Sequence, residues 1–176
     1  ELNPGIPIAM HLDHGNNLDT LKKAVGLGFT SVMIDGSLKE DGKTPRDYDD
    51  NARVTREVVE YSHKKGVTVE GELGTLGGIE DETAASRVIL TDPKDAERFV
   101  KETGVDALAL AIGTSHGAYK FKATPKLALD IVSETHGRIP KTALVMHGSS
   151  SVPQELVEEI NKYGGKLARA MGVPIE

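Results

Sequence analysis

Three histidines, His14, His116 and His147, each follow a short apolar run and each precede a glycine. Such runs are typical of buried strands, and the glycine lets the backbone turn away beside the imidazole. Imidazoles delivered by separate strands can converge on one ion. Three protein ligands with an open fourth position characterise a catalytic zinc site rather than a structural one. The pattern therefore predicts metal-assisted chemistry.

Acidic residues accompany these histidines. Asp13 directly precedes His14, where a carboxylate is suited to transfer a proton or to orient a metal ligand. Glu70 and Glu72 alternate along a strand and therefore share one of its faces. Two carboxylates on a buried face are costly without a positive charge, and a cation supplies one.

The segment 74–90 is long for a connection between a strand and a helix. It contains Gly77-Gly78, followed by Glu80 and Asp81. Glycine hinges before acids indicate a lid that brings a carboxylate to a substrate. A solvated acidic loop is the alternative interpretation.

Two strand ends are rich in small residues and hydrogen-bond donors, as phosphate binding requires. Neither a P-loop nor a Gly-x-Gly-x-x-Gly pattern accompanies them, which argues against a nucleotide. The residues concerned are Gly117, Lys120, Gly148, Ser149 and Ser150.

The other histidines need no site. His11 is expected to pack inside, on the strand that carries Asp13. His63 and His136 fall in the last turns of predicted helices, where an imidazolium suits the helix dipole.

Apolar strands alternate with amphipathic helices along the chain, which indicates a parallel sheet. Proline is expected at the first helical position in three cases, after Thr44, Asp92 and Thr124. The predicted strands are Ile8–Asp13, Ser31–Asp35, Val67–Leu73, Ala107–Ile112 and Ala143–His147. The predicted helices are Leu18–Val25, Arg46–Lys65, Lys94–Glu102, Lys126–Thr135 and Gln154–Lys162.

Polar residues close all five strands, and this decides between an open sheet and a barrel. A ligand on an open sheet meets few strands at one switch point, whereas every strand end of a barrel faces one shared mouth. We therefore predict an α/β fold, a TIM (β/α)8 barrel, of which residues 1–176 form a single partial domain of about five central βα units. An open fold remains the alternative, since five units cannot close the barrel.

The bulk composition excludes several classes of protein. The chain has 176 residues, a net charge of −6 and no cysteine. Scattered Lys and Arg argue against nucleic acid, and no apolar run approaches the roughly 20 residues that span a bilayer. The absence of cysteine excludes disulfides and thiolate ligands and fits a cytoplasmic location.

Five stretches resemble class II, metal-dependent fructose-1,6-bisphosphate aldolases. They are HLDHGN from His11, FTSVMIDGS from Phe29, VEGELGTLGG from Val69, LALAIGTSHGAYK from Leu108 and LVMHGSSSVPQ from Leu144. The resemblance extends over essentially the whole chain. It implies a TIM barrel, a catalytic zinc, a glycolytic-type lyase reaction on a phosphorylated sugar, and a homo-oligomer, dimer or tetramer.

The resemblance also implies roles for individual residues. His14, His116 and His147 match the family's zinc ligands, and Asp13 matches the acid/base at the aldehyde oxygen. Glu80 matches the loop carboxylate that moves the triose C3 proton. Asp35 and Glu72 match acids near the metal that hold a displaced or second cation. Gly117, Gly148 and Ser150 match contacts to phosphate and to a monovalent cation, Na⁺ or K⁺.

By the family pattern, strands before Ile8 and after Glu176 lie outside this chain, and the segment 81–88 is short. The family reaction is the cleavage of fructose 1,6-bisphosphate into dihydroxyacetone phosphate and glyceraldehyde 3-phosphate. No strand-end lysine suggests a Schiff base; Lys120 lies in a loop beyond a glycine. Tagatose or sedoheptulose bisphosphate is the alternative substrate, and a non-catalytic metal-binding fragment is the alternative class.

Overall fold

The computed structural model of the protein describes residues 5–75, 77–78, 89–116 and 127–149, together with Glu158 and Lys162. Within these ranges, five parallel strands form one sheet in which strand order follows chain order, β1-β2-β3-β5-β7. The strands are β1 (His11–Gly15), β2 (Ser31–Ile34), β3 (Thr68–Leu73), β5 (Ala107–Leu110) and β7 (Ala143–Val145).

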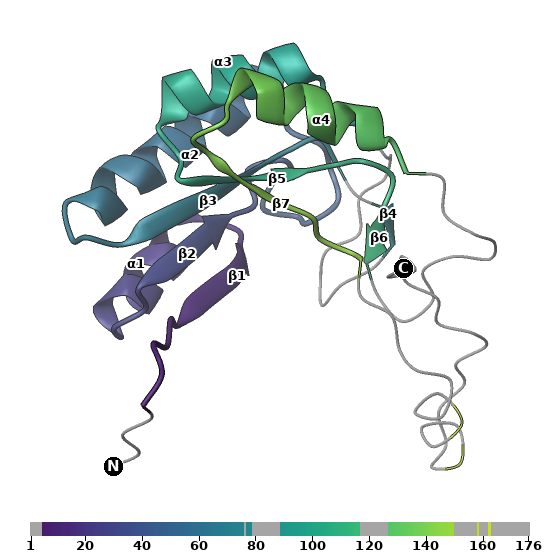
Figure 1. The fold of residues 1–176 in the computed structure, drawn as a ribbon. Coiled ribbons are helices and arrows are strands. Elements are labelled where there is room, and N and C mark those ends of the chain that lie inside the picture. Colours follow the sequence, from purple (N-terminus) through teal and green to yellow (C-terminus); the bar gives the residue numbers. More distant parts are fainter. Residues whose placement is uncertain are drawn as a thin grey trace.

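The helices follow the curve of the sheet along its outer side (Figure 1), and each contacts the next in the series. They are α1 (Leu18–Gly26), α2 (Tyr48–His63), α3 (Pro93–Thr103) and α4 (Leu129–Arg138). A doubly wound sheet reverses its strand order and places helices on both faces. Neither feature occurs in the described residues, so the winding is that of a barrel.

Side-chain caps begin three of these helices. Asn17 accepts a hydrogen bond from the backbone of Thr20, and Asp47 and Asp92 cap α2 and α3 in the same manner. Pro93 occupies the first turn of α3, as predicted, and Gly104 ends this helix with a φ of 75°.

The start of α2 differs from the prediction. Pro45 lies in an isolated bridge with Leu38 instead of opening the helix, and the backbone N–H of Arg46 donates to the carbonyl of Ser37. These contacts hold the segment in a loop until Asp47 caps the helix.

Two further boundaries were also placed too early. Strand β1 begins at His11 because its register with β2 starts opposite Ser31, and Ile8 is 68% exposed. Helix α4 begins at Leu129, without a side-chain cap, rather than at Lys126.

The core between sheet and helices fixes which way β3 presents its side chains. Val69 and Leu73 belong to apolar clusters that include residues of the outer helices. Between them, Gly71 leaves room for Phe99, whose ring would lie 3.1 Å from an added Cβ. Because strand side chains alternate, Glu70 and Glu72 face the opposite, inner side.

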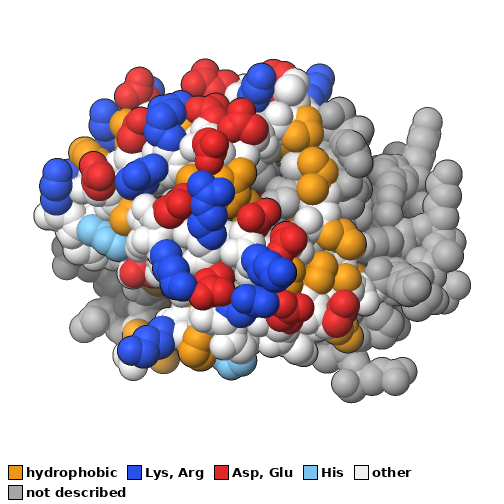
Figure 2. Space-filling model, turned by 90° about the horizontal axis from the view of Figure 1, so that it is seen from above, with side chains coloured by type: hydrophobic (Ala, Val, Ile, Leu, Met, Phe, Trp, Pro, Cys, Tyr) orange, Lys and Arg blue, Asp and Glu red, His pale blue; other side chains and the backbone are white. Residues whose placement is uncertain are grey.

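The outer face carries mixed charges (Figure 2). Ion pairs one helical turn apart connect Arg53 with Glu57, Lys101 with Glu97, and Arg138 with Glu134. Such exposed pairs are typical of a water-facing helix surface. Among the described residues, no helix combines the length and the apolarity that crossing a bilayer requires.

Candidate metal centre

The three strand-end histidines lie together. The ring centroid of His14 is 4.9 Å from that of His116 and 4.7 Å from that of His147, and the remaining pair is 6.0 Å apart. His14 comes from β1 at one edge of the described sheet, whereas His147 follows β7 at the other edge. The curvature of the sheet therefore brings residues 133 positions apart in sequence into one cluster.

A bulge in β1 aims the first of these rings. Leu12 pairs with Val32 and Gly15 with Ile34, so β1 has one residue more than β2 between these pairs. His14 lies in the bulge with a φ of 46°, the only positive φ of a non-glycine residue in the described ranges. Bulges re-aim side chains near active sites, and such strained conformations cluster there.

Backbone contacts hold the second ring. Strand β6 (Ser115–His116) pairs in parallel with β4 (Gly77–Gly78). Gly148 also packs against this strand, so tightly that an added Cβ would lie 2.7 Å from the backbone of Ser115. The glycine pair that the sequence suggested as a hinge thus forms a short strand beside His116.

Acids surround His14 at two depths. Its Nδ1 lies 3.5 Å from Asp35 Oδ2 and 3.8 Å from Glu72 Oε2, and both acids are buried. Asp13 Oδ1 lies 3.9 Å from His14 Nε2 and from His147 Nδ1, but the Asp13 side chain is 56% exposed. Asp13 is thus accessible to a ligand from solvent, whereas Asp35 and Glu72 lie behind the histidine.

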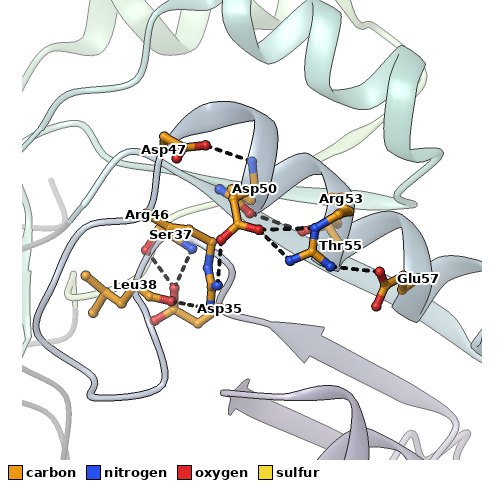
Figure 3. A network of polar contacts seen from close by, with 10 residues as sticks. Asp35, Ser37, Leu38, Arg46, Asp47, Asp50, Arg53, Thr55 and Glu57 are labelled. Carbon is orange, nitrogen blue, oxygen red and sulfur yellow. Dashed lines mark hydrogen bonds and ion pairs between the residues drawn. The ribbon is translucent and has the colours of Figure 1, made fainter.

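A loop network fixes Asp35 (Figure 3). Its Oδ1 accepts hydrogen bonds from the backbone and hydroxyl of Ser37, at 3.1 and 2.6 Å. Arg46 closes the loop by donating to the carbonyl of Leu38 and pairing with Asp50, at 3.0 Å each. Burial raises the pKa of Asp35, but the His14 imidazole and the Ser37 hydrogen bonds lower it by more, so the carboxylate form is favoured.

The remaining predicted residues fall into two groups. Gly148 is described, with a φ of 65°, and so is Ser149, whose hydroxyl donates to the Met146 carbonyl at 3.3 Å. The predictions for Glu80, Gly117, Lys120 and Ser150 lie outside the described residues.

Sequence reasoning misplaced one histidine and missed two contacts. His11 is exposed rather than packed inside, and its Nδ1 lies 2.8 Å from the Ser31 hydroxyl. His147 Nε2 lies 2.8 Å from Glu70 Oε1, and Asn51 donates to the backbone carbonyl of Glu72 at 2.8 Å. The Asp-Gly-Ser pattern at Asp35 could have indicated its local turn, but contacts across strands have no comparable signal.

The donor set fits a metal ion. Two groups of described residues each bring their donor atoms within 4.8 Å of one another: Asp13, His14 and His147, and His14 with Asp35 and Glu72. His14 belongs to both groups, whereas His116 belongs to neither and joins the cluster through its ring contacts with His14 and His147. Imidazole nitrogens and carboxylate oxygens without thiolates suit zinc and neighbouring divalent metals.

The fold and the site together define a barrel protein with a histidine–carboxylate cluster at the carboxyl ends of its parallel strands. The family described as fructose-bisphosphate aldolase class-II matches residues 1–166. A fructose-bisphosphate aldolase from Pseudomonas aeruginosa is 54% identical over 188 positions, covering 98% of this chain and 53% of that protein. One from Giardia intestinalis is 56% identical over 178 positions, covering 100% of this chain and 52% of that protein. The solved YdjI aldolase of Escherichia coli is 30% identical with a TM-score of 0.66, covering 88% of this chain and 49% of that one.

The chain belongs to the class II fructose-bisphosphate aldolase family, whose members are metal-dependent TIM-barrel enzymes. The resemblance and the fold class inferred from the sequence are thereby confirmed. The chain spans about half the length of the curated relatives it matches. Its 176 residues are fewer than the 188 positions aligned with the Pseudomonas protein, so it is shorter within that stretch.

Proposed function

We propose that this chain carries the metal-binding part of a class II aldolase that cleaves fructose 1,6-bisphosphate, reversibly, into dihydroxyacetone phosphate and glyceraldehyde 3-phosphate. The observation that carries the proposal is the cluster of His14, His116 and His147, with ring centroids 4.7 to 6.0 Å apart. The relatives named fructose-bisphosphate aldolase support the choice of reaction.

Zinc is the metal we propose for the three imidazoles, with Asp35 and Glu72 able to hold a displaced or second cation behind His14. When bound, the metal supplies a Lewis acid for the ketone oxygen of the substrate. The tight packing of Gly148 against Ser115 already explains why this position is glycine. The glycine is therefore no evidence for a phosphate contact at position 148, which we only propose.

Asp13 is the residue we propose for proton exchange with the C4 hydroxyl of the ketose. Its carboxylate is exposed, yet lies 3.9 Å from ring nitrogens of both His14 and His147. A general acid/base must be within reach of the substrate, which the buried Asp35 and Glu72 are not. Glu80 is proposed for the proton at the triose C3 carbon, on the basis of its sequence position alone.

The other assignments are also proposals. Gly117, Lys120, Gly148, Ser149 and Ser150 would contact the substrate phosphates and a monovalent cation. The enzyme would be a cytoplasmic homo-oligomer, and residues 1–176 would form one domain of its barrel. The short segment 81–88 also belongs to the proposal.

A coupled cleavage assay tests the proposal. Fructose 1,6-bisphosphate should be cleaved, and a chelator should abolish the activity until zinc or cobalt is restored. Tagatose 1,6-bisphosphate and sedoheptulose 1,7-bisphosphate serve as competing substrates. A higher kcat/KM on either would reassign the substrate, and chelator-resistant cleavage would contradict the metal role.

A further inference from the structure

Glu70 has a defined place in the fold but no part in the mechanism given above. It lies in the middle of β3, on the inner face, and is only 7% exposed. A buried carboxylate is costly unless hydrogen-bond donors or positive charge compensate it. Among the described residues, Glu70 makes its shortest side-chain contact with His147, whose Nε2 lies 2.8 Å from Glu70 Oε1.

This contact determines which nitrogen of His147 can bind a metal. An ionised carboxylate only accepts hydrogen bonds, so Nε2 must carry the proton that it shares with Glu70. A neutral imidazole with its proton on Nε2 has its lone pair on Nδ1. His147 Nδ1 lies 3.9 Å from Asp13 Oδ1. Asp13, His14 and His147 together form one of the two groups of possible metal ligands.

The second oxygen of Glu70 faces another element of the site. Glu70 Oε2 lies 3.7 Å from His11 Nε2, and His11 Nδ1 contacts the Ser31 hydroxyl at 2.8 Å. Side chains from β1, β2 and β3 thus form a connected series that ends at His147. The series explains why His11 lies beside the site although it is not among the converging rings.

The two glutamates of β3 therefore serve different imidazoles. Glu72 Oε2 lies 3.8 Å from His14 Nδ1. Glu70, which is two residues before Glu72 on the same face of β3, contacts His147 instead. A shared cation is not needed to explain Glu70, because an imidazole already lies within hydrogen-bond distance.

We propose that Glu70 is a positioning residue: its carboxylate holds the Nε2–H of His147 and so directs the Nδ1 lone pair at the metal. The inference rests on the proposed metal centre. Carboxylates behind metal-bound histidines fix the tautomer and the ring orientation, and their loss costs about 10- to 100-fold in metal affinity.

Metal affinity is the first test, measured by competition with a chelating dye for zinc and for cobalt. Glu70→Ala should weaken binding by about 10- to 100-fold. Glu70→Gln should lose much less, because the amide oxygen can still accept the Nε2–H. Glu57→Ala is the matched control, since Glu57 is exposed and pairs with Arg53 on the outer face. Circular dichroism confirms that each variant is folded.

The tautomer of His147 is the second test and needs no metal. In ¹⁵N-histidine-labelled metal-free protein at about pH 8, where imidazoles are neutral, NMR should show His147 protonated at Nε2. Glu70→Gln should keep this tautomer and Glu70→Ala should populate both.

The outcomes separate this inference from the proposed function. Metal affinity that His147→Ala leaves unchanged would overturn the metal centre and the role of Glu70 with it. A different result would overturn the role of Glu70 alone. In that case His147→Ala loses metal affinity, whereas Glu70→Ala keeps both its metal affinity and the Nε2–H tautomer of His147.

Discussion

Gly148 offers the sharpest test of how the structure holds the candidate site together. Its φ is 65°, in the left-handed region, and an added Cβ would lie 2.7 Å from the carbonyl carbon and oxygen of Ser115 and 2.9 Å from its nitrogen. Backbone atoms cannot move aside as a flexible side chain can. Because Ser115 precedes His116 and Gly148 follows His147, a backbone shift that relieves the overlap would disturb the position of one of these two imidazoles.

The expected cost of Gly148→Ala has two parts. Placing alanine in the left-handed region costs about 1–2 kcal/mol, and the overlap adds about 1–3 kcal/mol, as overpacking does elsewhere. The matched control is Gly66→Ala: Gly66 has a φ of 70°, but nothing lies within 4 Å of its added Cβ. Gly66→Ala should therefore be destabilised only by the cost of placing alanine in the left-handed region.

Urea unfolding followed by circular dichroism measures both free energies of unfolding, and dye competition measures zinc affinity in the same samples. We expect Gly148→Ala to be destabilised more than Gly66→Ala by about 1–3 kcal/mol and to bind zinc more weakly. Equal destabilisation together with equal zinc affinity would refute the close approach of Gly148 to Ser115.

The remaining predictions concern chemistry and one loop. Asp13→Ala should lower kcat by about 10²- to 10⁴-fold with zinc still bound, while Asp19→Ala, an exposed aspartate of α1, should not; an equal loss in both would remove Asp13 from the mechanism. Glu80→Gln should slow hydrogen-isotope exchange into dihydroxyacetone phosphate more than bond cleavage, and exchange at the wild-type rate would leave Glu80 a solvated loop acid. Borohydride with substrate should trap no lysine adduct, because the metal takes the place of a Schiff base; a trapped adduct would reverse this. The hydrogen bonds from Thr44, followed by that from Lys43, lower the pKa of Asp41 from 3.8 to about 2. The stabilisation that the Asp41 carboxylate provides is therefore present above about pH 4 and is lost as the pH falls through about 2. NMR titration of Thr44→Val should show the pKa of Asp41 rising toward 3.8, and an unchanged pKa would contradict this cause.

Much of the site could be predicted from the sequence because strand ends are locally encoded. An apolar run followed by His-Gly indicates that a strand ends nearby, and parallel strands place their carboxyl ends at one edge. His147 lies two residues beyond β7, whereas His116 lies six residues beyond β5, in the short strand β6. The five strands of the main sheet were predicted to within a few residues, whereas the short strands β4 and β6 were not predicted. The largest error is at the start of β1. There, apolar residues such as Ile8 suggested a strand that pairing with β2 does not support.

Other features depend on contacts between distant residues and have no local signal. The bulge at His14 arises from the register of β1 against β2, which one strand's sequence does not encode. The contact of Glu70 with His147 joins residues 77 positions apart. The start of α2 was predicted from Pro45, but Arg46 makes contacts with Ser37 and Leu38 that delay the helix.

Diffraction data collected at the zinc absorption edge, from crystals of the protein prepared with zinc, test whether His14, His116 and His147 share one metal ion. An anomalous-difference map should show a peak among His14, His116 and His147, with ligand nitrogens at about 2.0–2.1 Å and His147 bound through Nδ1. A map without a peak among these imidazoles, or with zinc held only by residues elsewhere, would overturn the proposed metal centre.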